Sequence, residues 1–185
     1  MKNIRTAALM IPSLAFLPLS ALAANVKDAK CSDMAKINER VTPEYLAVVY
    51  GYDKAGSIVV EEIDVGDLVR ESRQVNAQCA RNGTQKIKVV RKDLKRNSTA
   101  AATAAKTQTL NPAKAKCEDF VALGEEVQPL AVYWVAGHAK AGKIKGGEVD
   151  EEFLERPIAT LVQDCKAQPT ASFYDKTKAW FKRSI

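Results

Sequence analysis

The sequence has little of what a catalytic or metal-binding protein needs. Its 185 residues include a single histidine, His138, and four cysteines, none of them in a C-x-x-C pair. A histidine without a surrounding ligand cluster argues against a metal site or acid–base catalysis, and the missing C-x-x-C argues against dithiol redox chemistry. Patterns typical of a nucleophile elbow, a P-loop or an HExxH zinc site are also missing. We therefore expect no enzyme activity and no cofactor.

Long apolar segments are missing too, except at the N-terminus. Residues 1–23, MKNIRTAALMIPSLAFLPLSALA, combine a basic start, an apolar core and small residues at Ala21 and Ala23. This pattern is typical of a secretory signal peptide. The core is too short and too often broken by proline to rest as a membrane span, and no cysteine follows it to accept a lipid. We expect cleavage after Ala23 and a soluble exported protein without stable membrane insertion.

The rest of the chain repeats itself. It reads YGYDKAG at 50–56 and AGHAKAG at 136–142, which is 86 residues later. Alignment of residues 31–97 with 117–183 at this offset needs no gap and gives 18 identities in 67 positions. A match of this length at a fixed offset indicates a tandem duplication. We predict one unit at 24–97 and a second at 117–185, joined by an Ala- and Thr-rich linker at 98–116.

The cysteines follow the same repeat. Cys31 and Cys79 are 48 positions apart, and so are Cys117 and Cys165. Four cysteines allow three pairings, and a duplicated unit that once folded alone favours the pairing inside each unit. Export would supply the oxidising compartment, and closing a loop of this size contributes about 4 kcal/mol in the chain-entropy model. We predict two structural disulfides, Cys31–Cys79 and Cys117–Cys165.

Helical signals dominate both units. In the second unit, CEDFVAL predicts a short helix, Pro129 begins another whose fraying end is marked by Gly137 and Gly142, and Pro157 begins a third. The last segment, TASFYDKTKAWFKRSI, places four side chains along one helical stripe: Phe173, Thr177, Trp180 and Phe181. The first unit follows the same plan, except that KIKVVRK at 86–92 alternates like a strand. The predicted fold class is all-α, with two small disulfide-pinned helical domains in tandem.

Two of the predicted helices, at 45–50 and 130–136, are apolar on every face and must therefore be buried on every face. A unit of about 70 residues buries only about 60% of its unfolded surface, so part of each helix should meet the other unit or a second copy of the protein. The alternative is that each helix is a plain core helix covered by its own unit. The residues predicted to pair the units or bind clients are Tyr45, Leu46, Val48, Val49, Tyr50, Leu130, Val132, Tyr133, Trp134 and Val135.

The charges predict sensitivity to acid. Residues 24–97 carry a net charge of +3 and residues 117–185 carry −2. When the carboxylates are protonated, the charge of residues 24–185 rises towards +27, with His138 included. Carboxylates that are paired in the folded state then lose their partners, so the assembly should loosen in acid. We interpret the basic run Arg91, Lys92, Lys95 and Arg96 as a solvated face rather than a nucleic-acid site.

Two segments of the second unit, CEDFVALGEEVQPLAVYWVAG and RPIATLVQDCKAQPTASF, resemble the HdeA/HdeB family of periplasmic acid-stress chaperones of Gram-negative bacteria. The first unit matches more loosely, through CSDMAKINERVTPEYLAVVYG and DLVRESRQVNAQC. The resemblance implies a small helical domain with one disulfide that is dimeric and idle at neutral pH. In strong acid it would dissociate and partly unfold, and hold acid-denatured periplasmic proteins in solution without ATP. By position, the family's client-binding helix corresponds to residues 130–136.

This chain departs from the family pattern in its duplication, its linker and a first unit without an aromatic final helix. Those departures leave open whether the two units pair within one chain or the protein forms a homodimer. Our hypothesis is an ATP-independent, acid-activated periplasmic chaperone whose partners are acid-denatured periplasmic proteins. The alternative is a constitutive exported binding module that holds a fixed protein or lipid partner.

Overall fold

The protein is described by a computed structural model that covers residues 23–56, 62–97, 108–141, 144 and 146–183. The predicted signal peptide lies outside the described residues, apart from Ala23. In the described part the chain is mainly helical, and its strands are two residues long. No helix there combines the length and apolar composition that crossing a membrane requires. The all-α fold class is confirmed.

The elements of the two units follow each other in the same order. The first unit contains β1 (Ala24–Asn25), α1 (Cys31–Met34), the 3-10 helix η1 (Glu39–Val41), α2 (Thr42–Asp53), β2 (Ile63–Asp64), α3 (Val65–Cys79) and α4 (Ile87–Asn97). The second part contains β3 (Thr109–Leu110), α5 (Cys117–Val121), α6 (Gln128–Ala139), β4 (Glu148–Val149), α7 (Glu151–Leu154), α8 (Ala159–Ala167) and α9 (Phe173–Arg183). The bounds of α6 and α9 lie 86 positions after those of α2 and α4.

Local sequence explains where these helices begin. The side chain of Asp64 accepts a hydrogen bond from the backbone N–H of Asp67 at the start of α3. Asp150, 86 positions later, accepts one from the N–H of Phe153 at the start of α7. Both are ordinary N-caps, which satisfy N–H groups that a helix start leaves unpaired. Asp64 and Asp150 are equivalent in the repeat, and each caps the start of a helix.

One difference between the units has a simple cause. The 15-residue helix α3 runs without interruption through Glu71, but its counterpart is divided into α7 and α8. Pro157 occupies the position equivalent to Glu71. Proline lacks an N–H and its ring clashes with the preceding turn, so the helix ends at Leu154 and resumes at Ala159. The sequence predicts a third helix of the second unit that begins at Pro157, which corresponds to α8, but it does not predict α7.

Both predicted disulfides are present. Cys31 bonds to Cys79 and Cys117 bonds to Cys165, with a Cα–Cα distance of 4.8 Å in each case. The first bond joins α1 to α3, and the second joins α5 to α8. The pairing inside each unit is confirmed, and all four cysteines are used.

The last helices of the two units differ in what they bury. The predicted stripe of α9 is confirmed, because Phe173, Thr177, Trp180 and Phe181 are its buried residues. The strand-like alternation at 86–92 is misleading, because residues 87–97 form the helix α4. Ile87 and Val90 are the buried positions of α4, and they are three residues apart. That spacing suits one face of a helix, whereas the apparent alternation came from Ile87 and Val89, and Val89 is exposed.

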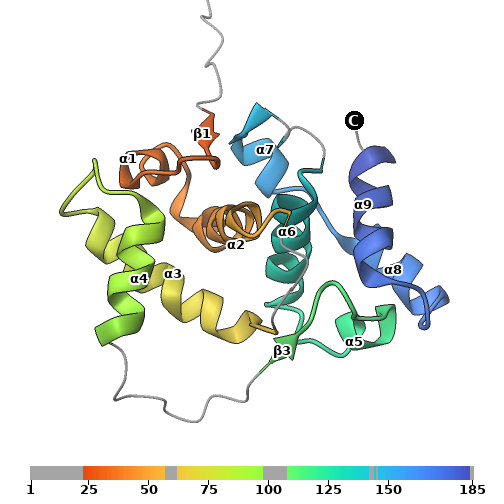
Figure 1. The fold of residues 1–185 in the computed structure, drawn as a ribbon. Coiled ribbons are helices and arrows are strands. Elements are labelled where there is room, and N and C mark those ends of the chain that lie inside the picture. The colour runs from red at the N-terminus through yellow and green to blue at the C-terminus, as the bar shows by residue number, and fades with distance from the viewer. Residues whose placement is uncertain (1–22, 57–61, 98–107, 142–143, 145, 184–185) are drawn as a thin grey trace, which may run out of the picture.

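The two units lie side by side with α2 and α6 between them. Figure 1 shows α1, α3 and α4 on one side of this central pair and α5, α8 and α9 on the other. The buried side chains of both units form one continuous apolar core. The two disulfide-pinned halves of the chain therefore share a core.

Candidate functional site

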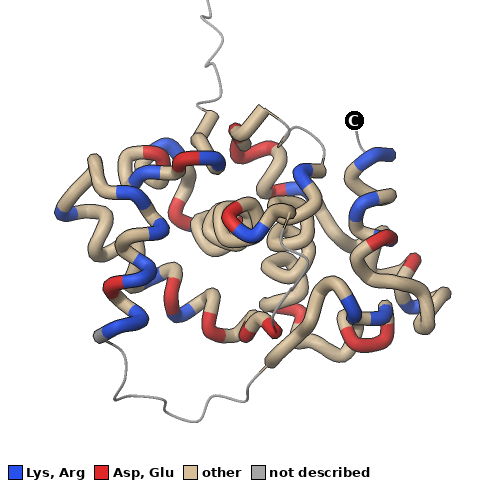
Figure 2. The backbone as a smooth tube through the Cα atoms, viewed as in Figure 1, with Lys and Arg blue, Asp and Glu red and all other residues tan. Residues whose placement is uncertain are grey.

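The candidate site is the pair of apolar helices, α2 and α6, at the centre of the molecule. Each makes its most extensive helix contact with the other. Figure 2 shows that the pair is free of charge along most of its length, while charged residues cover the surrounding helices. The ten predicted pairing or client-binding residues are all buried, with 0 to 3% of their surface exposed: Tyr45, Leu46, Val48, Val49, Tyr50, Leu130, Val132, Tyr133, Trp134 and Val135.

Two glycines let the helices come this close. A Cβ atom added at Gly51 would lie 2.0 Å from the carbonyl oxygen of Trp134. A Cβ atom added at Gly137 would lie 2.1 Å from the carbonyl oxygen of Val48. Gly137 follows Gly51 by 86 positions, as Trp134 follows Val48, so the helices cross about an approximate two-fold axis at their glycines. Only glycine permits such a backbone approach.

This crossing corrects an expectation. Gly137 was expected to mark the fraying end of its helix, but α6 continues to Ala139 and Gly137 is fully packed against α2. The identical Gly51/Gly137 column of the repeat was the available signal. It was misread because glycine is more often found at helix ends than at helix contacts.

The units also exchange their N-terminal strands. β1 of the first unit pairs with β4 of the second, with Ala24 opposite Val149. β3, just before the second unit, pairs with β2 of the first, with Leu110 opposite Ile63. A further backbone hydrogen bond runs from the N–H of Val65 to the carbonyl of Gln108 at 2.9 Å. The two ladders are equivalent under the repeat, and each joins one unit to the other.

The strand exchange changes the extent of the linker. Residues 98–107 of the predicted linker lie outside the described residues. Residues 108–116, in contrast, belong to the folded structure, because Leu110 and Ala115 are buried and Thr109–Leu110 forms β3. Composition alone suggested a linker here because alanine, threonine and lysine dominate, and the pairing partner of the strand is remote in sequence.

Polar contacts join the units at the rim of the apolar pair. The backbone N–H of Asn38 donates a hydrogen bond to the carboxylate of Glu151 at 2.6 Å. Arg40 forms an ion pair with Glu155 at 2.8 Å, but both side chains are largely exposed. Such an exposed pair contributes at most about 1 kcal/mol. These contacts therefore orient the units more than they hold them together.

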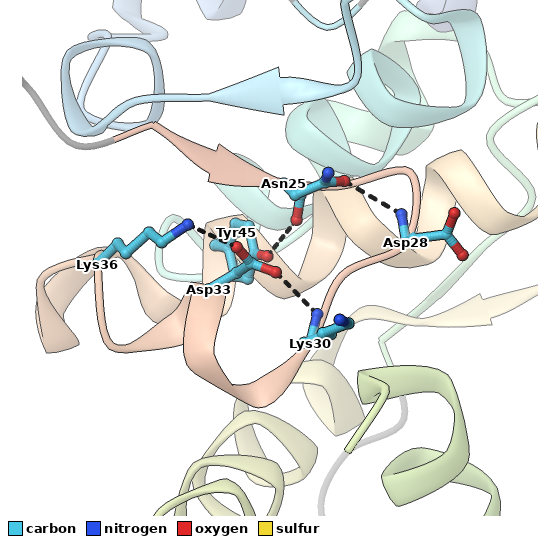
Figure 3. A network of polar contacts seen from close by, with 6 residues as sticks. All are labelled: Asn25, Asp28, Lys30, Asp33, Lys36 and Tyr45. Carbon is cyan, nitrogen blue, oxygen red and sulfur yellow. Dashed lines mark hydrogen bonds and ion pairs between the residues drawn. The ribbon is translucent and has the colours of Figure 1, made fainter. Parts of the chain in front are cut away.

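A buried carboxylate anchors the strand β1 (Figure 3). The carboxylate of Asp33 accepts a hydrogen bond from the backbone N–H of Lys30 and forms an ion pair with Lys36, both at 2.9 Å. The hydroxyl group of Tyr45 in α2 belongs to the same network and donates a hydrogen bond to the carbonyl oxygen of Asn25 in β1, at 2.5 Å. Burial alone would raise the pKa of Asp33, but the hydrogen bonds from Lys30, Lys36 and the backbone of Asn25 outweigh it and hold the pKa below its usual value.

Two other carboxylates of the first unit have the opposite shift. Burial raises the pKa of Glu44, whose Oε2 atom is buried with no hydrogen-bond partner in the described part of the chain. Burial likewise raises the pKa of Asp53, against the attraction of Lys88 and Arg91. Glu44 belongs to α2 and stands where the second unit has Leu130. The first copy of the apolar helix thus carries two carboxylates, Glu44 and Asp53, where the second copy has Leu130 and Ala139.

The single histidine lies at the edge of the helix crossing. His138 stacks on the ring of Trp134 at 5.1 Å, and its Nδ1 atom lies 2.9 Å from the hydroxyl of Tyr174. Within the described ranges no group of three or more histidine, cysteine or acidic side chains is placed to hold a metal ion. The ring is therefore packed among aromatic side chains of its own unit.

Comparison with known proteins gives consistent matches. A family model described as the HdeA/HdeB family matches residues 94–175, which include most of the second unit. A probable acid stress chaperone HdeA of Brucella ovis is 36% identical over 92 residues, which cover 47% of this chain and 81% of that protein. Proteins of the same name from Brucella canis and Brucella abortus are each 37% identical over 89 residues, covering 45% of this chain and 78% of each relative. No solved structure gives a significant match.

Proposed function

We propose, since this chain belongs to the HdeA/HdeB family, that it acts as an acid stress chaperone in the periplasm. HdeA/HdeB is a family of chaperones and not of enzymes. In our proposal α2 and α6 cover each other in the closed state, and strong acid separates the units. The exposed apolar helices then bind acid-denatured proteins and keep them in solution, without ATP. When the pH recovers, the helices pair again and release the client.

One observation carries this proposal: each apolar helix makes its most extensive helix contact with the apolar helix of the other unit. Gly51 and Gly137 bring the backbones of α2 and α6 into direct contact, so each helix covers a large part of the other. Separation of the units would expose a large apolar surface on both. Exposed apolar patches of this kind are typical of binding sites for other proteins.

Protonation of carboxylates supplies the driving force. The folded-state pKa of Asp33 is depressed, so its contribution to stability is present above the unfolded-state value, near 4, and is lost as the pH falls through the folded value. Asp33 anchors β1, which pairs with the other unit, so this loss weakens the exchanged strand. Protonation also removes the negative charges that balance the Lys and Arg residues, and the two units then repel each other.

Glu44 and Asp53 act in the opposite direction. Their folded-state pKa values are raised, so they reduce stability while they are ionised, and this loss disappears as the pH falls from the folded-state value to the unfolded-state value. The net response to acid is the balance of these two groups against Asp33 and the general repulsion. We infer that Glu44 and Asp53 move the opening to lower pH, which restricts it to strong acid.

The duplication gives this chaperone an unusual property. We extend the family assignment to the first unit because its elements repeat those of the second at a constant offset. The two units then take the place of two subunits, and the opening becomes a change within one molecule. The pH of this opening would be independent of protein concentration, whereas the dissociation of a dimer depends on it. A homodimer is not needed to bury the helices.

An aggregation assay tests the proposal. An acid-labile protein is brought to pH 2 with and without this chain, with an equal mass of an inert globular protein as the control, and light scattering is followed. We expect this chain, and not the control, to suppress scattering. A fluorescent dye that binds apolar surface should respond only in acid. Unchanged scattering at pH 2 would refute the chaperone proposal, and a strong dye signal at pH 7 would favour the constitutive binding module instead.

A further inference from the structure

The first unit contains a hollow of about 800 Å³ that lies between α3 and α4. Its lining comes from the end of α2, from β2, from both of these helices, and from Trp134 on α6 of the other unit. Sites for small molecules in proteins commonly have volumes of about 300 to 1,000 Å³. The hollow is separate from the contact surface of α2 and α6, although it reaches their edge.

The repeat explains why the second unit differs from the first at this place. In the second unit the equivalent space is filled by an aromatic cluster, in which the ring of Phe181 lies 4.7 Å from that of Trp180 and 5.2 Å from that of Phe153. The residues 86 positions earlier are Leu94, Lys95 and Asp67, and all three line the hollow. Charged side chains turn their ends to water and do not fill a core, so the first unit is left with space where the second has aromatic rings.

The acidic side chains of the lining are mostly engaged. Asp67 forms an ion pair with Arg70 at 2.9 Å, and Glu71 forms one with Arg91 at 2.7 Å. Asp64 accepts the hydrogen bond that caps α3. The charges of Asp67 and Glu71 are therefore balanced by arginines, and the carboxylate of Asp64 is used to cap α3.

The lysines of the lining are less engaged than its carboxylates. Among the described residues Lys54, Lys88, Lys92 and Lys95 form no direct ion pair, although Lys54 and Lys88 are attracted by the nearby Asp53. Glu62 is the one lining carboxylate without an ion pair or a capping role in the same part of the chain. The hollow thus presents a surplus of positive charge in a partly enclosed place, which concentrates anions.

The inner wall adds a hydrogen-bond donor and apolar surface. Tyr50 is 1% exposed, and its hydroxyl has no hydrogen-bond partner in the described part of the protein. A buried hydroxyl without a partner is rare in folded proteins, so this one has the capacity to bind a ligand oxygen. Burial raises the pKa of Tyr50, so its hydroxyl stays protonated and can donate a hydrogen bond. Ile63, Leu94 and Trp134 supply apolar neighbours.

We propose that this hollow binds an amphiphilic anion: a small molecule with a phosphate, carboxylate or sulfonate head on an apolar body. The lysines attract the head, the hydroxyl of Tyr50 donates a hydrogen bond to it, and the apolar body lies against Trp134 and Leu94. Because Trp134 belongs to the second unit, the ligand contacts both units and stabilises the paired state. The proposal concerns the folded protein at neutral pH and does not depend on chaperone activity.

Isothermal titration calorimetry of residues 24–185 at pH 7 tests the proposal with three probes. Octyl phosphate, used below its critical micelle concentration, carries both features; inorganic phosphate carries the charge alone, and octyl glucoside the apolar chain alone. We expect one octyl phosphate per chain, bound at least about tenfold more tightly than either of the others. Octyl phosphate should also raise the midpoint of thermal unfolding.

The repeat offers a matched pair of variants. Lys92→Glu reverses a charge of the lining and should weaken octyl phosphate binding about tenfold, because an opposite charge is replaced by a like one at short range. Lys178→Glu makes the same change at the equivalent position of the second unit and should alter binding less than about twofold. Lys95→Phe, which introduces the residue found at Phe181, should remove one lysine and place an aromatic ring in part of the hollow, and so weaken binding about tenfold without lowering the thermal midpoint.

Several outcomes would overturn the proposal. If octyl phosphate binds no more tightly than octyl glucoside, the hollow does not recognise the anionic head. If inorganic phosphate binds as tightly as octyl phosphate, the hollow does not recognise the apolar chain. Equal weakening by Lys92→Glu and Lys178→Glu would place binding outside the hollow, as would unchanged binding to Lys95→Phe. Each failure leaves the light-scattering assay at pH 2 unaffected, so it is distinct from a failure of the chaperone proposal.

Discussion

The glycine at the helix crossing offers the sharpest test of how the units are held together. In the variant Gly51→Ala the new Cβ would lie 2.0 Å from the carbonyl oxygen of Trp134 and 2.9 Å from the backbone nitrogen of His138. Ordinary contacts begin at 3.4 Å, so α2 and α6 must move apart by about 1.4 Å. Neither clashing atom belongs to a side chain that can rotate away.

The free-energy change follows from two opposing effects. Overpacking of this kind costs about 3 kcal/mol when backbone atoms must move, while alanine gains about 1 kcal/mol over glycine in a helix. We expect a net loss of about 2 kcal/mol, which corresponds to a fall of about 4–8 °C in the thermal midpoint of a chain this long. The loss falls on the contact between the units, so the variant should open at higher pH than the natural protein.

The assays are thermal unfolding at pH 7 and titration with an apolar-surface dye from pH 7 to pH 2. Gly83→Ala is the matched control, because its Cβ would meet only the Cβ of Ser32 at 4.0 Å. The equivalent variant Gly137→Ala should behave like Gly51→Ala, and the double variant should lose less than the sum, since both open the same contact. If Gly51→Ala unfolds and binds dye as the natural protein does, the helices do not need this close approach and the reasoning is wrong.

Three further predictions concern charge and assembly. Asp33→Asn should lower stability at pH 7 by about 1 kcal/mol more than Asp119→Asn, its exposed equivalent with the same capping bond to Lys116, and denaturant titrations should show this difference vanish in strong acid. Glu44→Leu, which installs the residue found at Leu130, should raise stability at pH 7 by about 1–2 kcal/mol and lose most of that gain below pH 4; an unchanged stability at pH 7 would show that the buried carboxylate is not strained. Because the units pair within one chain, sedimentation at pH 7 should show a monomer, and the pH midpoint of dye binding should not change over a hundredfold range of protein concentration; a midpoint that moves with concentration would indicate a dimer instead.

Most of the fold could be predicted from the sequence because its signals are local or repeated. The start of α6 follows from Pro129, and the buried stripe of α9 follows from helical spacing. The disulfide pairing follows from the duplication, which makes one of three pairings consistent with a unit that once folded alone. Local signals failed at residues 86–92, where alternation and a helical face give the same apolar pattern over a short window.

The candidate site could be predicted only in part. The apolar character of α2 and α6 showed that both must be covered, but left open whether the cover came from the other unit or from a second molecule. The hollow could not be foreseen, because it depends on which side chains of the first unit face the place that Phe153, Trp180 and Phe181 occupy in the second. Glu44 looked unremarkable in sequence and becomes significant only when α6 and its own unit enclose it.

The family resemblance, the repeat, the disulfide pairing and the helical content can all be derived from the order of the amino acids. These are encoded by residue types and spacings that act over one helix turn or one disulfide loop. Tertiary structure alone decided that α2 and α6 cross at Gly51 and Gly137, that the N-terminal strands are exchanged, and that residues 108–116 belong to the fold. Such contacts join residues distant in the chain, and they depend on the shape of both surfaces at once. No pattern in either segment alone can specify them.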